Sequence, residues 1–196
     1  MQLRAGEPSA YLGFDDVIDG DAAGVATLAA DLRRASLDEV SFARTAFEWV
    51  RDNIGHSYDV GDPRVTLAAS EVIAEGVGLC YAKSHLLVAL LRGGGVPAGL
   101  CYQRLGSPAE DWFLHGLVAV HLNGSWHRLD PRGNKPGIDA QFSVTNERLA
   151  YVPERARAEV DYPEVFVAPV NEVVAVLRTA TDVLVADLPS GLTATG

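Results

Sequence analysis

Residues 76–98, GVGLCYAKSHLLVALLRGGGVPA, contain the feature that most limits how this chain can fold. Positions 86–91 are apolar without interruption, so a helix here is apolar on every side and must be buried on every side. Its polar residues lie in the first turns, and Gly93 is expected to cap its C-terminus. The sequence therefore predicts a central helix that begins near Cys80 and is enclosed by the other elements.

Two amphipathic helices are expected before this central helix. In the first, Asp21 is the expected N-cap, and the apolar stripe comprises Val25, Leu28, Ala29 and Leu32. The second is expected to begin at Ser36, with Glu39 completing a Ser-x-x-Glu capping box, and to end at Gly55. Its apolar side chains recur at three- and four-residue steps: Val40, Ala43, Phe47, Val50 and Ile54.

The remaining segments predict a mixed fold. Ser70 is expected to cap a short helix that Gly76 closes, residues 133–165 have the composition of loops, and residues 170–184 return to helical spacing. Between them lie three short strand-like segments, at 98–105, 115–122 and 125–130.

Asn123-Gly124, between the last two strand-like segments, is a strong signal for a two-residue hairpin turn. Helices followed by an antiparallel sheet and a closing helix predict an α+β fold. The 196 residues suit one domain with a substantial core.

Composition argues against some classes of partner and ligand. The formal net charge of −10 argues against a nucleic-acid partner or an anionic membrane surface. The chain has two cysteines, Cys80 and Cys101, too few for a disulfide framework or a paired zinc site, and no cofactor or metal is expected. The first residues lack an apolar signal core, which leads us to expect a cytoplasmic protein with reduced thiols.

Cys80 is a candidate nucleophile because of its place at the start of the central helix. The partial positive charge of a helix N-terminus favours a thiolate over a thiol. Gly78 would allow a tight turn and the approach of a substrate carbonyl. A thiolate also needs a base that can hold and return a proton. Cys101, in a strand-like segment, is expected to be buried and inert.

The predicted hairpin selects His115 as that base. A two-residue turn pairs Leu122 with Ser125, and continuing outward it would place His121 opposite Trp126, Leu117 opposite Asp130 and His115 opposite Arg132. His115 and Asp130 then lie diagonally on one face, roughly 7–8 Å apart between backbones, a distance that side chains can bridge. A carboxylate in this position can hold an imidazole in one tautomer and support its charged form. The other face carries Val118, Val120, Leu122 and Leu129 and is expected to face the core.

The other histidines are weaker candidates. Helical geometry turns His85 about 140° away from Cys80. His121 has no carboxylate in register, and His127 points to the apolar face of the hairpin. Because a lone histidine is usually structural, structural roles are expected for these two and for His56.

Two segments resemble the transglutaminase-like superfamily, a branch of the papain-like cysteine-enzyme fold, over about residues 40–132. GLCYAKSHLLVALLRGGGVPA is similar to the family's Gly-x-Cys helix followed by Leu-Leu-Arg and Gly-Val-Pro-Ala, and HGLVAVHLNGSWHRLDP is similar to its histidine strand followed by Trp and Leu-Asp-Pro. The resemblance implies a core at about residues 36–132 with a C-terminal helical extension at about 169–187. It also implies that Cys80 is the nucleophile, His115 the base and Asp130 the residue that orients the base.

The chain departs from the family pattern near the histidine. The family often has a tryptophan two residues after the histidine and an acid two residues further on, where this chain has Leu117 and Ala119. The family also places an aromatic residue upstream of the cysteine, and Tyr58 is the candidate here, in the cleft wall, in an oxyanion hole or simply packed against its neighbours. The backbone N–H of Cys80 is preferred over Tyr58 as the donor to the oxyanion.

These features predict a cysteine-dependent acyl-transfer enzyme that acts on amide bonds through a thioester, with hydrolysis as the expected outcome. The substrate would be a protein, a peptide or a small amide. Two alternatives remain: an acyltransferase similar to the arylamine N-acetyltransferases, and a non-catalytic binding scaffold of the same fold.

Overall fold

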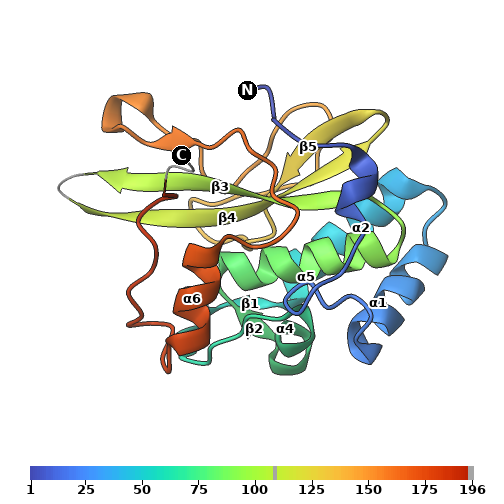
Figure 1. Cartoon of the computed structure of the whole chain (residues 1–196), viewed down its shortest axis with the longest axis horizontal. Helices are drawn as coiled ribbons and strands as arrows, with labels where there is room; N and C mark the ends of the chain where they lie inside the picture. The colour runs from blue at the N-terminus through green and yellow to red at the C-terminus, as the bar shows by residue number, and fades with distance from the viewer. Residues whose placement is uncertain (108–109, 194–196) are drawn as a thin grey trace.

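The computed structural model describes residues 1–107 and 110–193 and has helix α5 (Cys80–Gly93) at its centre. Every residue of α5 from Cys80 to Arg92 is buried, as the uninterrupted apolar run predicts. A four-stranded sheet covers one side of α5, and three helices, α1 (Ala23–Arg34), α2 (Glu39–Asn53) and α4 (Ala69–Glu75), cover the opposite side (Figure 1). This arrangement confirms the predicted α+β class.

The start of α2 differs from the prediction. Asp38, not Ser36, is the N-cap: its carboxylate accepts a hydrogen bond from the Ser41 backbone N–H at 2.7 Å, and the Ser41 hydroxyl accepts one from the Asp38 N–H. Ser36 instead donates its hydroxyl to the Leu32 carbonyl, at the end of α1. The Ser-x-x-Glu spacing competes with an Asp-x-x-Ser spacing two residues later, and the aspartate is the cap that forms.

The other helix ends also shift by one or two residues. Ala22 is the N-cap of α1, and Asp21 does not cap it. α4 begins before Ser70, and Gly76 closes it with a φ of 67°, as predicted. α2 ends before Gly55, which begins a strand, and Gly94 rather than Gly93 caps α5.

The sheet has the strand order β5-β4-β3-β6, with β3 (Ala98–Ser107), β4 (Glu110–Leu122), β5 (Ser125–Leu129) and β6 (Val160–Asp161) all antiparallel to their neighbours. Asn123 and Gly124 form the predicted β4–β5 turn, with φ values of 52° and 76° as a type I′ turn requires.

The predicted hairpin register is confirmed from the Leu122–Ser125 pair beside the turn to the Val118–Leu129 pair, where the ladder ends. The expected pairing of Leu117 with Asp130 and of His115 with Arg132 is therefore not part of the ladder, because the chain leaves the sheet after Leu129.

Both faces of this sheet are covered. The face predicted to be apolar, with Val118, Val120, Leu122 and Leu129, packs into the main core around α5. The opposite face forms a smaller core in which Leu117 and Cys101 pack with Tyr11 of a short 3-10 helix, η1 (Pro8–Tyr11). Cys101 is fully buried there.

A second, two-stranded parallel sheet, which the sequence did not reveal, lies near the start of α5. β1 (Gly55–His56) pairs with β2 (Val77–Gly78) and places His56 opposite Gly78. A short helix, α3 (Ser57–Val60), follows β1 directly. This pairing brings residues from before and after α4 together at the N-terminal end of α5.

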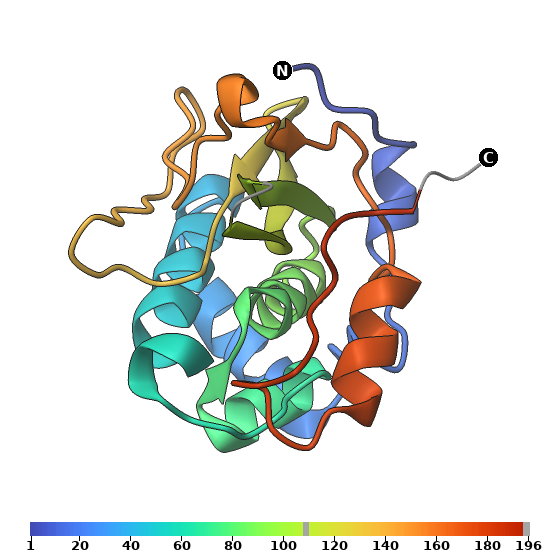
Figure 2. The ribbon, with the colours of Figure 1, turned by 90° about the vertical axis from the view of Figure 1, so that its left-hand side faces the viewer.

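The described part of the chain beyond β5 forms two further helices and the edge strand β6. A 3-10 helix, η2 (Arg155–Arg157), precedes β6, and α6 spans Asn171–Thr179, shorter than the expected helix at 170–184. After α6 the backbone forms hydrogen bonds with distant parts of the chain. The Val183 N–H donates to the Pro63 carbonyl, and the Pro189 carbonyl accepts a hydrogen bond from the Leu114 N–H of β4. Figure 2 looks toward the end of α5 and shows the C-terminal segment, in red, running beside it.

Among the described residues, no helix is long and apolar enough to cross a membrane.

Candidate active site

Cys80 is the first residue of α5 and lies in the wall of a pocket of about 490 Å³. The preceding Leu79 provides no side-chain cap, so the first N–H groups of the helix are not satisfied by a capping side chain. The Cys80 Sγ accepts a hydrogen bond from the Gly116 backbone N–H at 3.4 Å, and the residue is 8% exposed. The sulfur therefore lies at the N-terminal end of α5 and within reach of a backbone N–H donor from β4.

Gly116 is a site residue that the sequence analysis missed. A Cβ at this position would lie 2.8 Å from Tyr81 Cδ1 and 3.3 Å from Tyr81 Cα. The absence of a side chain therefore lets β4 approach α5 closely enough for the Gly116 N–H to reach the sulfur. A lone glycine in a strand, HGLVAVHL, was the available signal.

Asp130 holds His115 from the side away from Cys80. The His115 Nε2 lies 2.8 Å from Asp130 Oδ2, so Nδ1 is the ring nitrogen left to face the cysteine. Asp130 is fully buried and also accepts hydrogen bonds from the backbone N–H of Ala150 at 3.0 Å and of Arg132 at 3.2 Å. The proximity predicted from the hairpin is present, although it arises just after β5 rather than within the ladder.

The surroundings of His115 and Asp130 favour the charged form of each side chain. Burial alone lowers the pKa of His115, but the carboxylate of Asp130 and the sulfur of Cys80 together raise it to about 10. Burial alone raises the pKa of Asp130, but His115 and the two backbone donors bring it below its ordinary value. The imidazolium–carboxylate state is therefore favoured at neutral pH, with the imidazolium beside Cys80.

Arg132, which lines the pocket, forms an ion pair with Asp59. Arg132 donates to both carboxylate oxygens of Asp59, at 2.6 and 3.0 Å, and thereby joins the segment after β5 to α3. Tyr151 packs its ring edge-on against His115, with centroids 5.0 Å apart, and also lies under the Arg132 guanidinium. Neither contact was visible in the sequence, because the partners are far apart along the chain.

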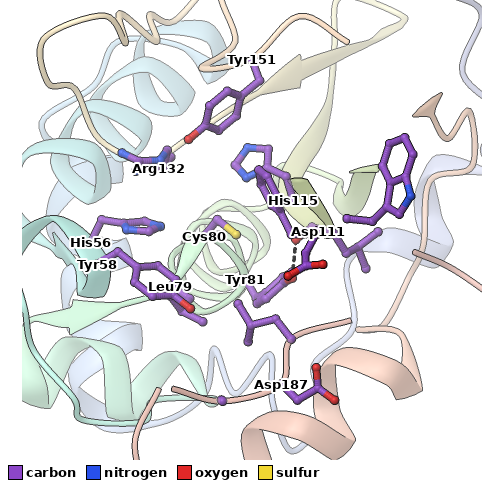
Figure 3. Close-up of a pocket in the computed structure, with 15 residues that line it drawn as sticks. His56, Tyr58, Leu79, Cys80, Tyr81, Asp111, His115, Arg132, Tyr151 and Asp187 are labelled. Atoms are coloured by element: carbon purple, nitrogen blue, oxygen red, sulfur yellow. Dashed lines mark hydrogen bonds between the residues drawn. The ribbon is translucent and has the colours of Figure 1, made fainter. Parts of the chain in front are cut away.

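His56 and Tyr58 form the wall opposite His115, and in Figure 3 the His56 and His115 rings approach Cys80 from two sides. His56, for which a structural role was expected, is 8% exposed and faces the pocket. Burial and the nearby Arg132 lower its pKa to about 3, so it is neutral. Tyr58 also lines the pocket and is 47% exposed, and its part in an oxyanion hole stays a prediction.

Gly78 does not line the pocket. It lies in β2, two residues before Cys80, where a Cβ would come within 2.9 Å of both Ala82 and Thr66 side-chain atoms. Close packing therefore accounts for the glycine, and its expected role in admitting a substrate carbonyl stays a prediction.

The remaining histidines and the second cysteine lie outside the pocket. His85 Nδ1 is 2.8 Å from the Leu67 carbonyl oxygen, His121 packs edge-on against Trp126, and His127 Nε2 is 3.3 Å from the Leu122 carbonyl oxygen. Burial raises the pKa of the Cys101 thiol to about 12.

The rest of the pocket wall comes from the β3–β4 hairpin and the C-terminal segment. β4 contributes the run 111–115, and the C-terminal segment contributes 186–188. Together with Tyr151, Trp112 and Phe113 of β4 make the lining of the pocket partly aromatic. Within 1–107 and 110–193, no group of three or more His, Cys, Asp or Glu side chains is arranged to hold a metal ion.

The fold is similar to that of solved structures at low sequence identity. One solved structure, a candidate cysteine protease from Cytophaga hutchinsonii, is 20% identical, with a TM-score of 0.54 over 65% of this chain and 42% of that one. Another, the periplasmic domain of TgpA from Pseudomonas aeruginosa bound to ethylmercury, is 18% identical, with a TM-score of 0.49 over 64% of this chain and 49% of that one. The chain thus spans less than half the length of either, and no curated protein matches it.

A family model gives the assignment. The model of the transglutaminase-like superfamily matches residues 26–131, more than half of the chain, and the match contains Cys80, His115 and Asp130. It begins earlier than the resemblance seen in the sequence and includes most of α1. The chain therefore belongs to the transglutaminase-like superfamily.

Proposed function

We propose that this protein is a cysteine-dependent acyl-transfer enzyme that hydrolyses amide bonds through a thioester on Cys80. The observation that carries the proposal is the continuous arrangement of Cys80, His115 and Asp130 at one pocket wall, with Nε2 of the histidine held by the buried carboxylate. A protein that used this fold only for binding would have no need for a buried charged pair beside a cysteine.

The reaction follows from the charges at the site. The Cys80 thiolate attacks the carbonyl carbon of the substrate, a C–S bond forms, and the carbonyl π electrons move to the oxygen. As the oxyanion collapses, the C–N bond breaks and the His115 imidazolium donates its proton to the leaving nitrogen. Neutral His115 then takes a proton from water, and the hydroxide equivalent attacks the thioester and releases the acid and the thiolate. Asp130 stabilises the imidazolium whenever it forms.

The pocket suggests the kind of substrate. Its volume of about 490 Å³ and its aromatic walls suit an acyl group with an apolar part, presented by a peptide, a protein or a small amide. The net charge of −10 argues against nucleic acid or an anionic membrane as the partner. A catalytic thiol must stay reduced, which is consistent with the cytoplasmic location that we propose.

The test is a screen of small amides, peptides and glutamine-containing proteins in which ammonia release and product mass are recorded. Hydrolysed products that disappear with Cys80→Ala would support the proposal. Products joined to an added amine would instead identify a transglutaminase, and an acetyl thioester formed from acetyl-coenzyme A would identify an N-acetyltransferase-like enzyme. A stable partner protein recovered in pull-downs, together with ordinary thiol reactivity at Cys80, would instead indicate a non-catalytic binding scaffold.

A further inference from the structure

His56 is a buried polar group at the pocket for which the reaction above has no use. It is 8% exposed, and its Nδ1 has no hydrogen-bond partner. Among the described residues, Nε2 likewise has no hydrogen bond. Buried polar nitrogens in proteins normally have partners, and an exception calls for an explanation, such as a catalytic role.

The backbone holds this imidazole in place. His56 pairs with Gly78 in the β1–β2 sheet, which links it to the segment that leads into Cys80. Its ring points toward Cys80 from a different side than the ring of His115 (Figure 3). A donor at this place would act on a carbonyl oxygen while the sulfur attacks the carbonyl carbon.

The charge state suits a donor rather than a base. A neutral imidazole carries one N–H that it can donate, and burial and Arg132 keep His56 neutral by lowering its pKa to about 3. His115, in contrast, is held by Asp130 and favours the charged form. The two histidines that flank Cys80 are therefore set for different tasks.

We infer that His56 is a catalytic residue that donates its ring N–H to the oxyanion formed when Cys80 attacks a carbonyl group, alongside the backbone N–H of Cys80. This inference rests on the proposed acyl transfer. Tyr58 is the competing side chain, but it is 47% exposed and lies on the short helix α3, whereas His56 is fixed by strand pairing. Preorganised donors that need no rearrangement contribute most to oxyanion stabilisation.

The experiment compares two reactions of the same sulfur. Acylation of Cys80 by p-nitrophenyl acetate passes through an oxyanion and expels p-nitrophenolate, whereas alkylation by iodoacetamide displaces iodide without any oxyanion. His56→Leu and His56→Phe, which lack the donor, should lower the acylation rate about 100-fold and leave the alkylation rate within about twofold. His56→Gln, which keeps an N–H donor, should recover most of the acylation rate, and His121→Gln, outside the pocket, should change neither reaction.

Several outcomes would overturn the inference. Unchanged acylation in both donor-less variants would show that no N–H of His56 is used, and an equal loss in acylation and alkylation would show damage to the pocket. A loss with Tyr58→Phe but not with His56→Leu would assign the donor to Tyr58. If the wild-type protein were alkylated but never acylated at Cys80, the proposed acyl transfer itself would fail, which is a different result from equal acylation of wild type and variant.

Discussion

The Asp130→Asn substitution removes a buried negative charge and keeps the shape of the side chain. Asp130 is fully buried, with a relative exposure of 0%, and its carboxylate is hydrogen-bonded to His115 Nε2 at 2.8 Å. With the carboxylate present, the pKa of His115 is raised to about 10 and that of Asp130 is lowered, so both are charged at pH 6. Without it, burial favours the neutral imidazole, and Cys80 loses its positive neighbour.

The size of the effect follows from the ionisation of the thiol. An ordinary cysteine, which titrates near pH 8.5, is roughly 0.3% thiolate at pH 6. Loss of the imidazolium beside Cys80 should therefore lower the alkylation rate of this residue at pH 6, at most by about 300-fold, which is the ratio between a fully ionised thiol and an ordinary one at that pH. Because ordinary thiols ionise as the pH rises, with about three quarters ionised at pH 9, the difference should shrink to less than about twofold there.

The assay is the rate of iodoacetamide labelling of Cys80 between pH 5 and 9, read by peptide mass spectrometry, with melting temperature recorded for each variant. Asp16→Asn, an exposed carboxylate paired with Arg178 outside the pocket, is the control and should match the wild type. A variant rate equal to wild type at pH 6 would refute the argument that Asp130 supports the thiolate through His115. A loss of the same size at every pH would point to a distorted pocket instead.

The stability contribution of the ion pair has a defined pH window. For His115, the raised pKa means that the contribution is complete below its ordinary value of 6.5 and is lost as the pH rises through about 10. For Asp130, the lowered pKa means that the contribution is present above its ordinary value of 3.8 and is lost as the pH falls below it.

Three further predictions concern the cysteines, the close helix–strand contact and the choice of histidine. A substoichiometric dose of iodoacetamide at about pH 6 should label Cys80 before Cys101, because burial raises the pKa of the Cys101 thiol to about 12. Equal labelling of the two cysteines would identify Cys80 as an ordinary core residue. Gly116→Ala should lower the free energy of unfolding in urea by about 1–3 kcal/mol, because the new Cβ meets Tyr81 at 2.8 Å, and should slow Cys80 chemistry; an unchanged midpoint would show that β4 can move away without cost. His115→Ala should abolish turnover of any substrate that the screen finds and His121→Ala should not, with circular dichroism as the check on folding; the reverse result would make the assignment of the base wrong.

Local patterns along the sequence were sufficient for the elements on which the site depends. The uninterrupted apolar run at 86–91 can be satisfied only by burial, and it predicted the central helix and the place of Cys80 at its start. Asn123-Gly124 is a turn whose geometry requires positive φ at two adjacent residues, and it predicted the register that brings His115 near Asp130. In both cases the controlling interactions are between residues close together in the chain.

The features that sequence patterns did not reveal depend on contacts between distant residues. The β1–β2 pairing brings His56 to the pocket, the ion pair with Asp59 holds Arg132 in the pocket wall, and the C-terminal segment forms another part of the wall. Strands of two residues carry no periodicity, and one histidine or arginine resembles any other until its neighbours are known. Local sequence therefore places Cys80, His115 and Asp130, whereas only the packing of α3, β1 and the C-terminal segment around the start of α5 decides which other side chains line the pocket.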